Sequence, residues 1–120
     1  MLNQFSRTEL LFGSEAITRL QNAHVAVFGI GGVGGYTVEA LARSGVGSFD
    51  LIDNDTVALT NLNRQIIATL DTVGQPKVEV MAKRIASINP DAKVNCRQCF
   101  FYRKISTNLI SRNMITLSMP

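Results

Sequence analysis

Three glycines, Gly29, Gly31 and Gly34, form a G-x-G-x-x-G run directly after a short apolar stretch. Residues without a Cβ let the backbone turn sharply and approach a phosphate, and the free N–H groups at the start of a following helix supply partial positive charge. The run therefore predicts a loop that binds the phosphates of a nucleotide. The alternative interpretation is a tight turn with a structural role alone.

A carboxylate follows at the spacing that such a loop requires. Asp53 lies 19 residues after Gly34, at the end of a second apolar stretch, where it can accept hydrogen bonds from ribose hydroxyls. The apolar stretch before the glycines, the helical pattern after them and this acid together favour a functional nucleotide site over a structural turn.

Two cations favour ATP over NAD as the ligand. Arg64 lies in a polar loop between Asn63 and Gln65, and Lys77 follows shortly after Gly74. Arginine presents a planar fork to phosphate oxygens and lysine presents a point charge. An NAD site generally has little positive charge near the pyrophosphate and needs room for nicotinamide. Each cation alone is more typical of a solvated surface, but their shared position after the ribose carboxylate favours ATP.

The hydrophobic pattern predicts the elements that position these residues. Continuous apolar runs are typical of strands buried in a parallel sheet, and apolar residues three or four apart indicate helices. The expected elements are strands over residues 25–28, 49–52 and 92–97, a helix from the glycines to Ser44-Gly45, and a helix from Pro76 to Asn89. The expected apolar faces of the helices are Val33, Thr37, Ala40 and Leu41 in the first and Val78, Met81, Ala82, Ile85 and Ile88 in the second. The fold class is therefore α/β, a partial Rossmann-like parallel sheet, preceded by short N-terminal helices.

Length and composition restrict the remaining choices. A chain of 120 residues and 13.1 kDa, 46% of it hydrophobic, has room for one globular domain and excludes a two-domain enzyme. It has no run of about 18 apolar residues and no signal-peptide layout, so we expect a cytoplasmic protein without a membrane partner. Cys96 and Cys99 form a lone C-x-x-C, and with His24 as the single histidine the chain cannot supply a four-ligand zinc site alone. No metal ligand is assigned.

Three blocks of the sequence, GIGGVGGYTVEALARSGVG, LIDNDTVALTNLNRQ and VGQPKVEVMAKRIASINP, resemble the adenylating superfamily of the ThiF, HesA and MoeB type. This superfamily includes ubiquitin-activating enzymes and the bacterial activators of sulfur-carrier proteins. The blocks are most similar to the tRNA threonylcarbamoyladenosine dehydratase branch, and the resemblance covers about residues 5–100. One departure is Gly35, where the family often has serine.

The resemblance implies ATP-dependent adenylation of a carboxylate, here the threonylcarbamoyl group of a modified tRNA, which is then closed into a ring. By position, Gly29, Gly31, Gly32 and Gly34 would line the phosphates, and Asp53 or Asp55 would bind the ribose. Asn63, Arg64, Gln65 and Lys77 would contact the triphosphate, with Arg64 and Lys77 as catalytic cations. Arg7 falls where the superfamily places an arginine that reaches into a partner subunit's site, which implies a homodimer. The alternative for Arg7 is an exposed helix arginine.

The last twenty residues depart from both the pattern and the resemblance. They contain Arg103, Lys104 and Arg112 but no acid, although the superfamily holds Mg²⁺ with an aspartate after a later strand. We expect residues 1–100 to be the ATP-binding N-terminal part of one domain and residues 101–120 to be a tail outside the family. Codons can be chosen for this tail that, when read two nucleotides later, translate as LPENIDQFDFSQYDYVVDA. This translation restores an acidic segment of the kind that the resemblance implies, so one hypothesis is a frameshift in the gene. The other hypothesis is a natural divergent tail.

Three other functions remain open. A sulfur-carrier adenylyltransferase would use the same chemistry on a protein C-terminus. An NAD(P)-binding oxidoreductase fragment would use the glycine loop without the cations. A nucleotide-binding relic would retain the loop without catalysis.

Overall fold

The computed structural model describes residues 2–99 and the strand at residues 114–118. The elements in chain order are α1 (Ser6–Phe12), α2 (Ser14–Asn22), β1 (His24–Phe28), α3 (Gly32–Ser44), β2 (Ser48–Ile52), the short 3₁₀ helix η1 (Leu59–Asn61), α4 (Lys77–Ile88), β3 (Lys93–Arg97) and β4 (Met114–Ser118). Helices alternate with strands from β1 to β3, which confirms the expected α/β class. Within the described residues no helix is long and apolar enough to cross a bilayer.

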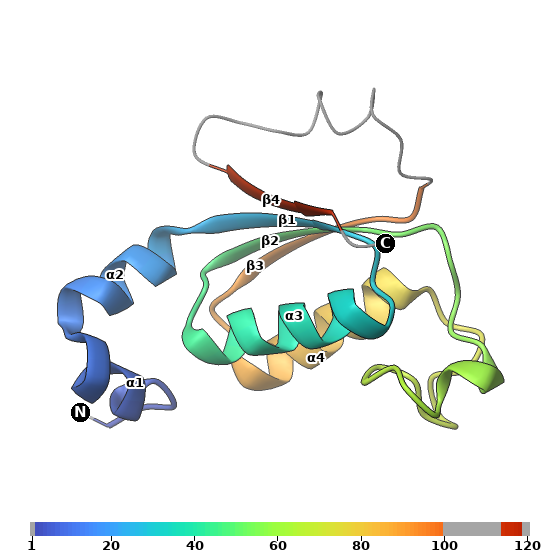
Figure 1. The fold of residues 1–120 in the computed structure, drawn as a ribbon, viewed down its shortest axis with the longest axis horizontal. Coiled ribbons are helices and arrows are strands. Elements are labelled where there is room, and N and C mark those ends of the chain that lie inside the picture. Colours follow the sequence, from blue (N-terminus) through green and yellow to red (C-terminus); the bar gives the residue numbers. More distant parts are fainter. Residues whose placement is uncertain (1, 100–113, 119–120) are drawn as a thin grey trace.

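The four strands form a parallel sheet in the order β3-β2-β1-β4. Phe28 of β1 is paired with Ile52 of β2, so these two strands end side by side at the same edge of the sheet. Helices α3 and α4 lie together along one face of the sheet, and α1 and α2 lie at the end from which β1 starts (Figure 1). The loops that follow β1 and β2 are therefore at the opposite end from α1.

Most of the core lies between the sheet and helices α3 and α4. It is made by alternate residues of the strands and the inner faces of the two helices, including Val25, Val27, Phe49, Leu51, Val38, Ala42, Val78, Met81 and Ile85. Each large side chain buried in this way contributes about 1.5–3 kcal/mol of transfer free energy. Residues of the opposite pleat, Ala26, Phe28 and Ile52, form a second cluster with Cys99 packed against it.

The apolar face predicted for α4 is confirmed, but the pattern predicted for α3 is only partly right, because Leu41 packs against the core while Val33 and Ala40 are exposed. Val33 is 61% exposed, whereas Val38 and Ala42 are fully buried. Gly34 and Gly35 are also buried, and a Cβ at Gly35 would lie 3.4 Å from Cγ2 of Ile66. The start of α3 therefore packs closely against the loop of Ile66 through glycines. A search for periodic hydrophobic residues does not detect such buried glycines. The predicted stop is confirmed, because Gly45 ends α3 in the left-handed conformation at φ 102°.

The expectation of only three strands is wrong. Strand β4 pairs in parallel with β1, with Val25 opposite Ile115. The segment MITLS has neither strict alternation nor a turn signal before it, and its strand conformation depends on the free edge of β1 rather than on local pattern. The other positions of the tail, residues 101–113 and 119–120, lie outside the described residues, as do the charges of Arg103, Lys104 and Arg112.

Candidate nucleotide-binding site

The predicted glycine turn joins the end of β1 to the start of α3. Gly29 has φ 95°, a left-handed conformation that only glycine adopts without strain. Its N–H donates a hydrogen bond of 2.8 Å to the carbonyl of Ile52 at the end of β2. The turn is therefore attached to the neighbouring strand at the carboxyl edge of the sheet, where open parallel sheets bind ligands.

Asp53 links this turn to the next loop. Its Oδ2 accepts a hydrogen bond from the N–H of Ile30 at 2.6 Å, and its Oδ1 accepts one from the N–H of Asp55 at 2.8 Å. Hydrogen bonds to a carboxylate are about twice as strong as neutral ones. Asp53 thus fixes the backbone of the glycine turn, in addition to lying where a ribose is expected.

The start of α3 can be approached by a ligand. Gly31 precedes the helix without a side-chain cap, and the first turn contains no acidic residue. Within the described part of the chain, a Cβ built on Gly32 would meet nothing within 4 Å, so the side of the helix start at this glycine is open. Free N–H groups and the helix dipole at this position attract an anion.

The loop after β2 is held by Asn61, a residue that the sequence interpretation did not select. Asn61 is buried, and its Oδ1 accepts a hydrogen bond of 2.8 Å from the N–H of Ala58. Its carbonyl accepts hydrogen bonds from the N–H groups of Arg64 at 3.2 Å and Gln65 at 2.9 Å. Asparagine favours turns because its side chain can hydrogen-bond to nearby backbone groups. This turn preference is the sequence signal that could have pointed to Asn61.

Gln65 lies beside the glycine turn with an unused polar atom. The residue is 8% exposed, and its Nε2 lies 3.9 Å from the position that a Cβ of Gly31 would take. Its Oε1 is buried without a hydrogen-bond partner within the described part of the chain. Since an unsatisfied buried acceptor costs about 1–3 kcal/mol, the atom fits a ligand that brings an N–H or O–H group. Nucleotides carry such donors on the ribose and the base.

Lys77 is the first residue of α4 and is also buried, at 6% exposed. Its Nζ lies 3.9 Å from Oδ2 of Asp55, and its N–H donates a hydrogen bond of 3.0 Å to the carbonyl of Asp55. Through Asp55 and Asp53, the start of α4 is connected to the glycine turn. The structure therefore brings Lys77 to the same edge of the sheet as the glycines.

Arg64 and Asn63 are exposed and bonded to each other. Nη1 of Arg64 donates to the carbonyl of Thr60 and to Oδ1 of Asn63, both at 2.9 Å. A guanidinium has five N–H donors, so these bonds leave others for an anion. Arg64 lies in the same loop as Gln65. Its guanidinium is hydrogen-bonded to residues of that loop rather than to the glycine turn.

Arg7 is not brought to the site within one chain. It lies on α1, at the end of the molecule opposite to the turn that precedes α3 (Figure 1). The residue is exposed. Of the residues selected from the sequence, Arg7 alone lies at that end of the described structure.

The C-x-x-C pair is divided between the two faces of the sheet. The Sγ–H of Cys96 donates to the carbonyl of Val78 in α4 at 3.4 Å, whereas Cys99 packs against the cluster of the other face. Burial raises the pKa of the Cys96 thiol above its ordinary value of 9.0, and the charge of Glu79 adds to this effect. Residues 2–99 and 114–118 contain no group of three His, Cys, Asp or Glu side chains that could hold a metal ion.

Known proteins are similar to this chain in sequence. The tRNA threonylcarbamoyladenosine dehydratase of Bacillus subtilis is 55% identical over 101 residues, which are 84% of this chain and 40% of that protein. The molybdopterin-synthase adenylyltransferase of Salmonella typhimurium is 38% identical over 106 residues, 88% of this chain and 43% of that protein.

A solved structure shows the same fold. The E. coli tRNA N6-threonylcarbamoyladenosine dehydratase, in complex with ATP, has a TM-score of 0.86 and 42% identity over 94% of this chain and 48% of its own. The chain thus spans less than half the length of each of these three relatives. The profile of the ThiF family matches residues 5–116, and the chain belongs to the ThiF family.

Proposed function

We propose that the chain is the ATP-binding N-terminal part of an enzyme that adenylates a carboxylate, the threonylcarbamoyl group of a modified tRNA. The observation that carries the proposal is the linkage of the glycine turn to Lys77 through Asp53 and Asp55 at one edge of the sheet. The buried, unpaired Oε1 of Gln65 supports a nucleotide at this edge. The B. subtilis and E. coli relatives support tRNA as the substrate. With this substrate we expect the reaction to take place in the cytoplasm.

ATP, when bound, supplies the adenylyl group that activates the carboxylate. The amides at the start of α3 bind phosphate charge, and the glycines allow the backbone to approach it. Lys77 provides a buried positive charge that stabilises the negative charge developing as pyrophosphate departs, and Arg64 adds a second cation from its loop. Asp53, and Asp55 beside it, offer carboxylate oxygens to ribose hydroxyls, while Gln65 and Asn63 supply neutral hydrogen-bonding groups.

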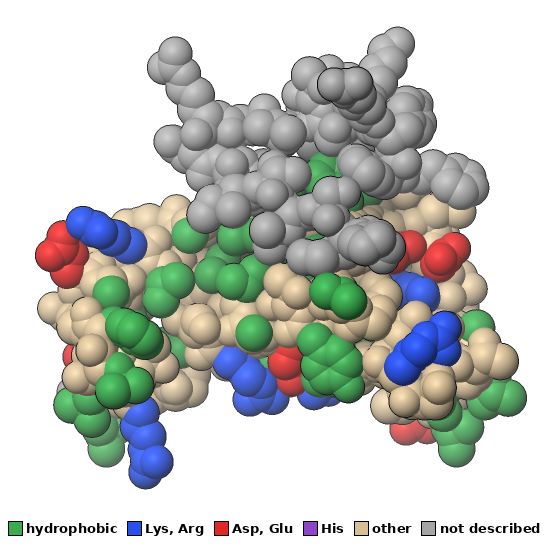
Figure 2. Space-filling model, viewed as in Figure 1, with side chains coloured by type: hydrophobic (Ala, Val, Ile, Leu, Met, Phe, Trp, Pro, Cys, Tyr) green, Lys and Arg blue, Asp and Glu red, His purple; other side chains and the backbone are tan. Residues whose placement is uncertain are grey.

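We also propose that two copies associate through α1. This helix has no buried residue, and Leu10, Leu11 and Phe12 are 86%, 81% and 69% exposed. Figure 2 shows hydrophobic side chains gathered over α1 at the lower left. Packing of α1 against the carboxyl edge of a second copy's sheet would remove this apolar area from water and bring Arg7 to the partner's nucleotide site.

Magnesium is expected in the complete reaction, because it neutralises triphosphate charge. The tail in which its expected aspartate should lie, residues 101–120, contains no Asp or Glu. The proposed roles of the described residues do not depend on that ligand.

A sulfur-carrier protein is the second candidate substrate, supported by the similarity to the Salmonella adenylyltransferase. The two substrates can be compared with two chimeras, in which residues 2–99 replace the matching segment of the B. subtilis dehydratase or of the Salmonella adenylyltransferase, each offered both substrates. We expect pyrophosphate release with ATP and threonylcarbamoyladenosine-containing tRNA, and loss of that release in Lys77→Met. Release only with a carrier protein ending in Gly-Gly would contradict the tRNA assignment.

A further inference from the structure

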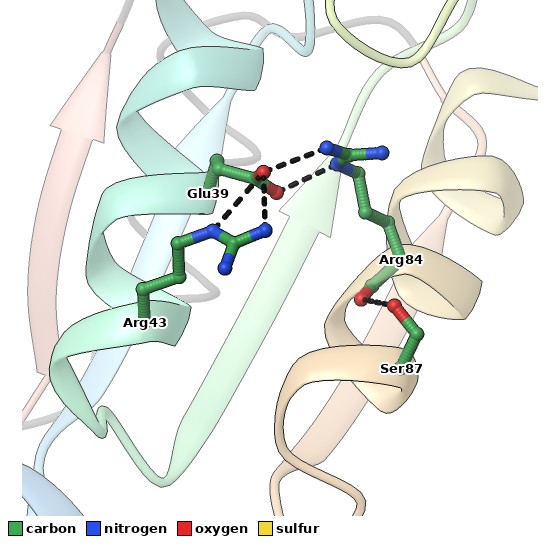
Figure 3. A network of polar contacts seen from close by, with 4 residues as sticks. All are labelled: Glu39, Arg43, Arg84 and Ser87. Atoms are coloured by element: carbon green, nitrogen blue, oxygen red, sulfur yellow. Dashed lines mark hydrogen bonds and ion pairs between the residues drawn. The ribbon is translucent and has the colours of Figure 1, made fainter. Parts of the chain in front are cut away.

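A buried carboxylate joins the two helices that begin at the nucleotide site. Glu39 of α3 is 8% exposed, and its two oxygens accept hydrogen bonds from Nε and Nη2 of Arg84 in α4 at 2.6 and 2.7 Å. Arg43, one turn later in α3, donates to Oε2 of Glu39 from Nε and Nη2, both at 3.2 Å. Figure 3 shows Glu39 directed across the space between the helices toward Arg84, with Arg43 beside it on its own helix.

Glu39 and Arg84 lie at the same distance from the first residue of their helices. Glu39 comes seven residues after Gly32, the first residue of α3, and Arg84 comes seven residues after Lys77, the first residue of α4. Both helices return between parallel strands, so they run in the same direction. The pair is therefore about two turns, roughly 10 Å, from both helix starts.

The form of the contact fixes the relative position of the helices. Two parallel N–H···O bonds between a planar guanidinium and a carboxylate define both distance and orientation. Apolar contacts are not directional, so they define the relative orientation of neighbouring helices less strictly than this pair does. A change at the Glu39–Arg84 pair consequently alters the distance between the α3 amides and the Lys77 ammonium. These are the two groups proposed to bind the triphosphate.

We propose that Glu39 and Arg84 are positioning residues for triphosphate binding, acting through the spacing of α3 and α4. This inference rests on the proposed function of the site. It goes beyond that function because neither residue belongs to the glycine turn or to the loop that carries Arg64. Adenosine, which lacks the phosphates, does not engage both helix starts and therefore depends on the pair much less than ATP does.

The test is the ratio of the dissociation constants of adenosine and ATP, measured by calorimetric titration of the 120-residue chain and its variants. We expect Glu39→Gln and Arg84→Gln each to weaken ATP binding about tenfold, which corresponds to ~1.4 kcal/mol, and to change adenosine binding less than about twofold. The double variant should be no worse than either single variant, since both remove the same contact. Arg84→Lys, which keeps the charge but not the planar fork, should give an intermediate loss.

Matched controls separate positioning from stability. Arg43→Gln removes a bond within α3 alone, and Glu15→Gln removes the exposed Arg19–Glu15 pair of α2, whose side chains are 80% and 83% exposed. Both controls should leave the ratio unchanged. Equal loss of ATP and adenosine binding in Glu39→Gln, or no loss of either at a temperature where circular dichroism shows a folded chain, would overturn the inference. If Glu39→Gln does not fold, Arg84→Lys decides alone: an unchanged ratio overturns the inference. Failure of the unaltered chain to bind ATP would instead refute the proposed function.

Discussion

The carboxylate of Asp53 holds the backbone of the glycine turn, because its Oδ2 accepts a hydrogen bond of 2.6 Å from the N–H of Ile30. A residue selected for ribose binding thus also shapes the loop that faces the phosphates. Its second oxygen accepts from Asp55, the residue beside Lys77. Loss of Asp53 is therefore expected to disturb both the ribose and the phosphate contacts.

Asp53→Asn tests this double role. The variant turns one of the two acceptors into an N–H₂ group facing a backbone N–H, which should lower the free energy of unfolding by about 1–3 kcal/mol and weaken ATP binding. Urea denaturation and ATP titration measure the two effects. Asp91→Asn, at an exposed aspartate, is the control and should change neither. Normal stability of Asp53→Asn would contradict the structural role.

Substitutions in the glycine turn should separate folding from binding. Gly32→Ala places a methyl group where none of the described residues lies within 4 Å, so we expect stability within about 1 kcal/mol of the unaltered chain. The same methyl group blocks the approach of a phosphate, so ATP binding should be lost. Gly29→Ala, at φ 95°, should instead cost about 1–2 kcal/mol of stability. Unchanged ATP binding in Gly32→Ala would show that phosphates do not contact this turn.

Much of the site could be predicted from the sequence because its signals are local. The glycine turn, its strand and helix, and Asp53 follow from spacing and hydrophobic pattern, and the structure places them as expected. The orientation of Arg64 and the bonds of Asn61 could not be predicted, because they depend on the path of an irregular loop. Strand β4 was missed because the edge of β1, far away in the sequence, provides its hydrogen bonds.

The ion pair between α3 and α4 should make stability depend on pH. The hydrogen bonds from Arg84 lower the pKa of Glu39 below its ordinary value of 4.5, against the opposing effect of burial and with further help from Arg43. A lowered pKa in the folded state means that the stabilisation is complete above about pH 4.5 and is lost as the pH falls through the lowered pKa. The difference in unfolding free energy between the unaltered chain and Glu39→Gln should therefore be constant near neutral pH and shrink in acid. A difference that grows in acid would contradict this assignment.

The divided cysteine pair predicts slow thiol chemistry. Although Cys96 is exposed as a residue, partial burial of its thiol raises the pKa, so less thiolate, the reactive form, is present at about pH 8 than in an unfolded chain. Mass spectrometry after iodoacetamide treatment should show slower labelling of Cys96 in the folded chain than in urea. Rapid formation of a Cys96–Cys99 disulfide in the folded chain would contradict their positions on opposite faces.

The tail makes a prediction about the gene. In the shifted translation that the codons permit, read two nucleotides later, the letters DYVVD fall on residues 114–118, which form β4. We therefore expect the coding DNA for residues 101–120 to contain an acidic, DYVVDA-like reading in that frame. A stop codon in the shifted frame, or a sequence without that string, would favour a natural divergent tail.

Thermal unfolding of the 120-residue chain with ATP or NAD⁺ tests the identity of the ligand most directly. ATP should raise the melting temperature, since a ligand at a hundred times its dissociation constant adds about 2.7 kcal/mol of stability, and NAD⁺ should not. The shift should disappear in Lys77→Met, which removes the buried ammonium while keeping a side chain of similar length. Stabilisation by NAD⁺ equal to or greater than that by ATP would contradict the assignment of the site to a triphosphate.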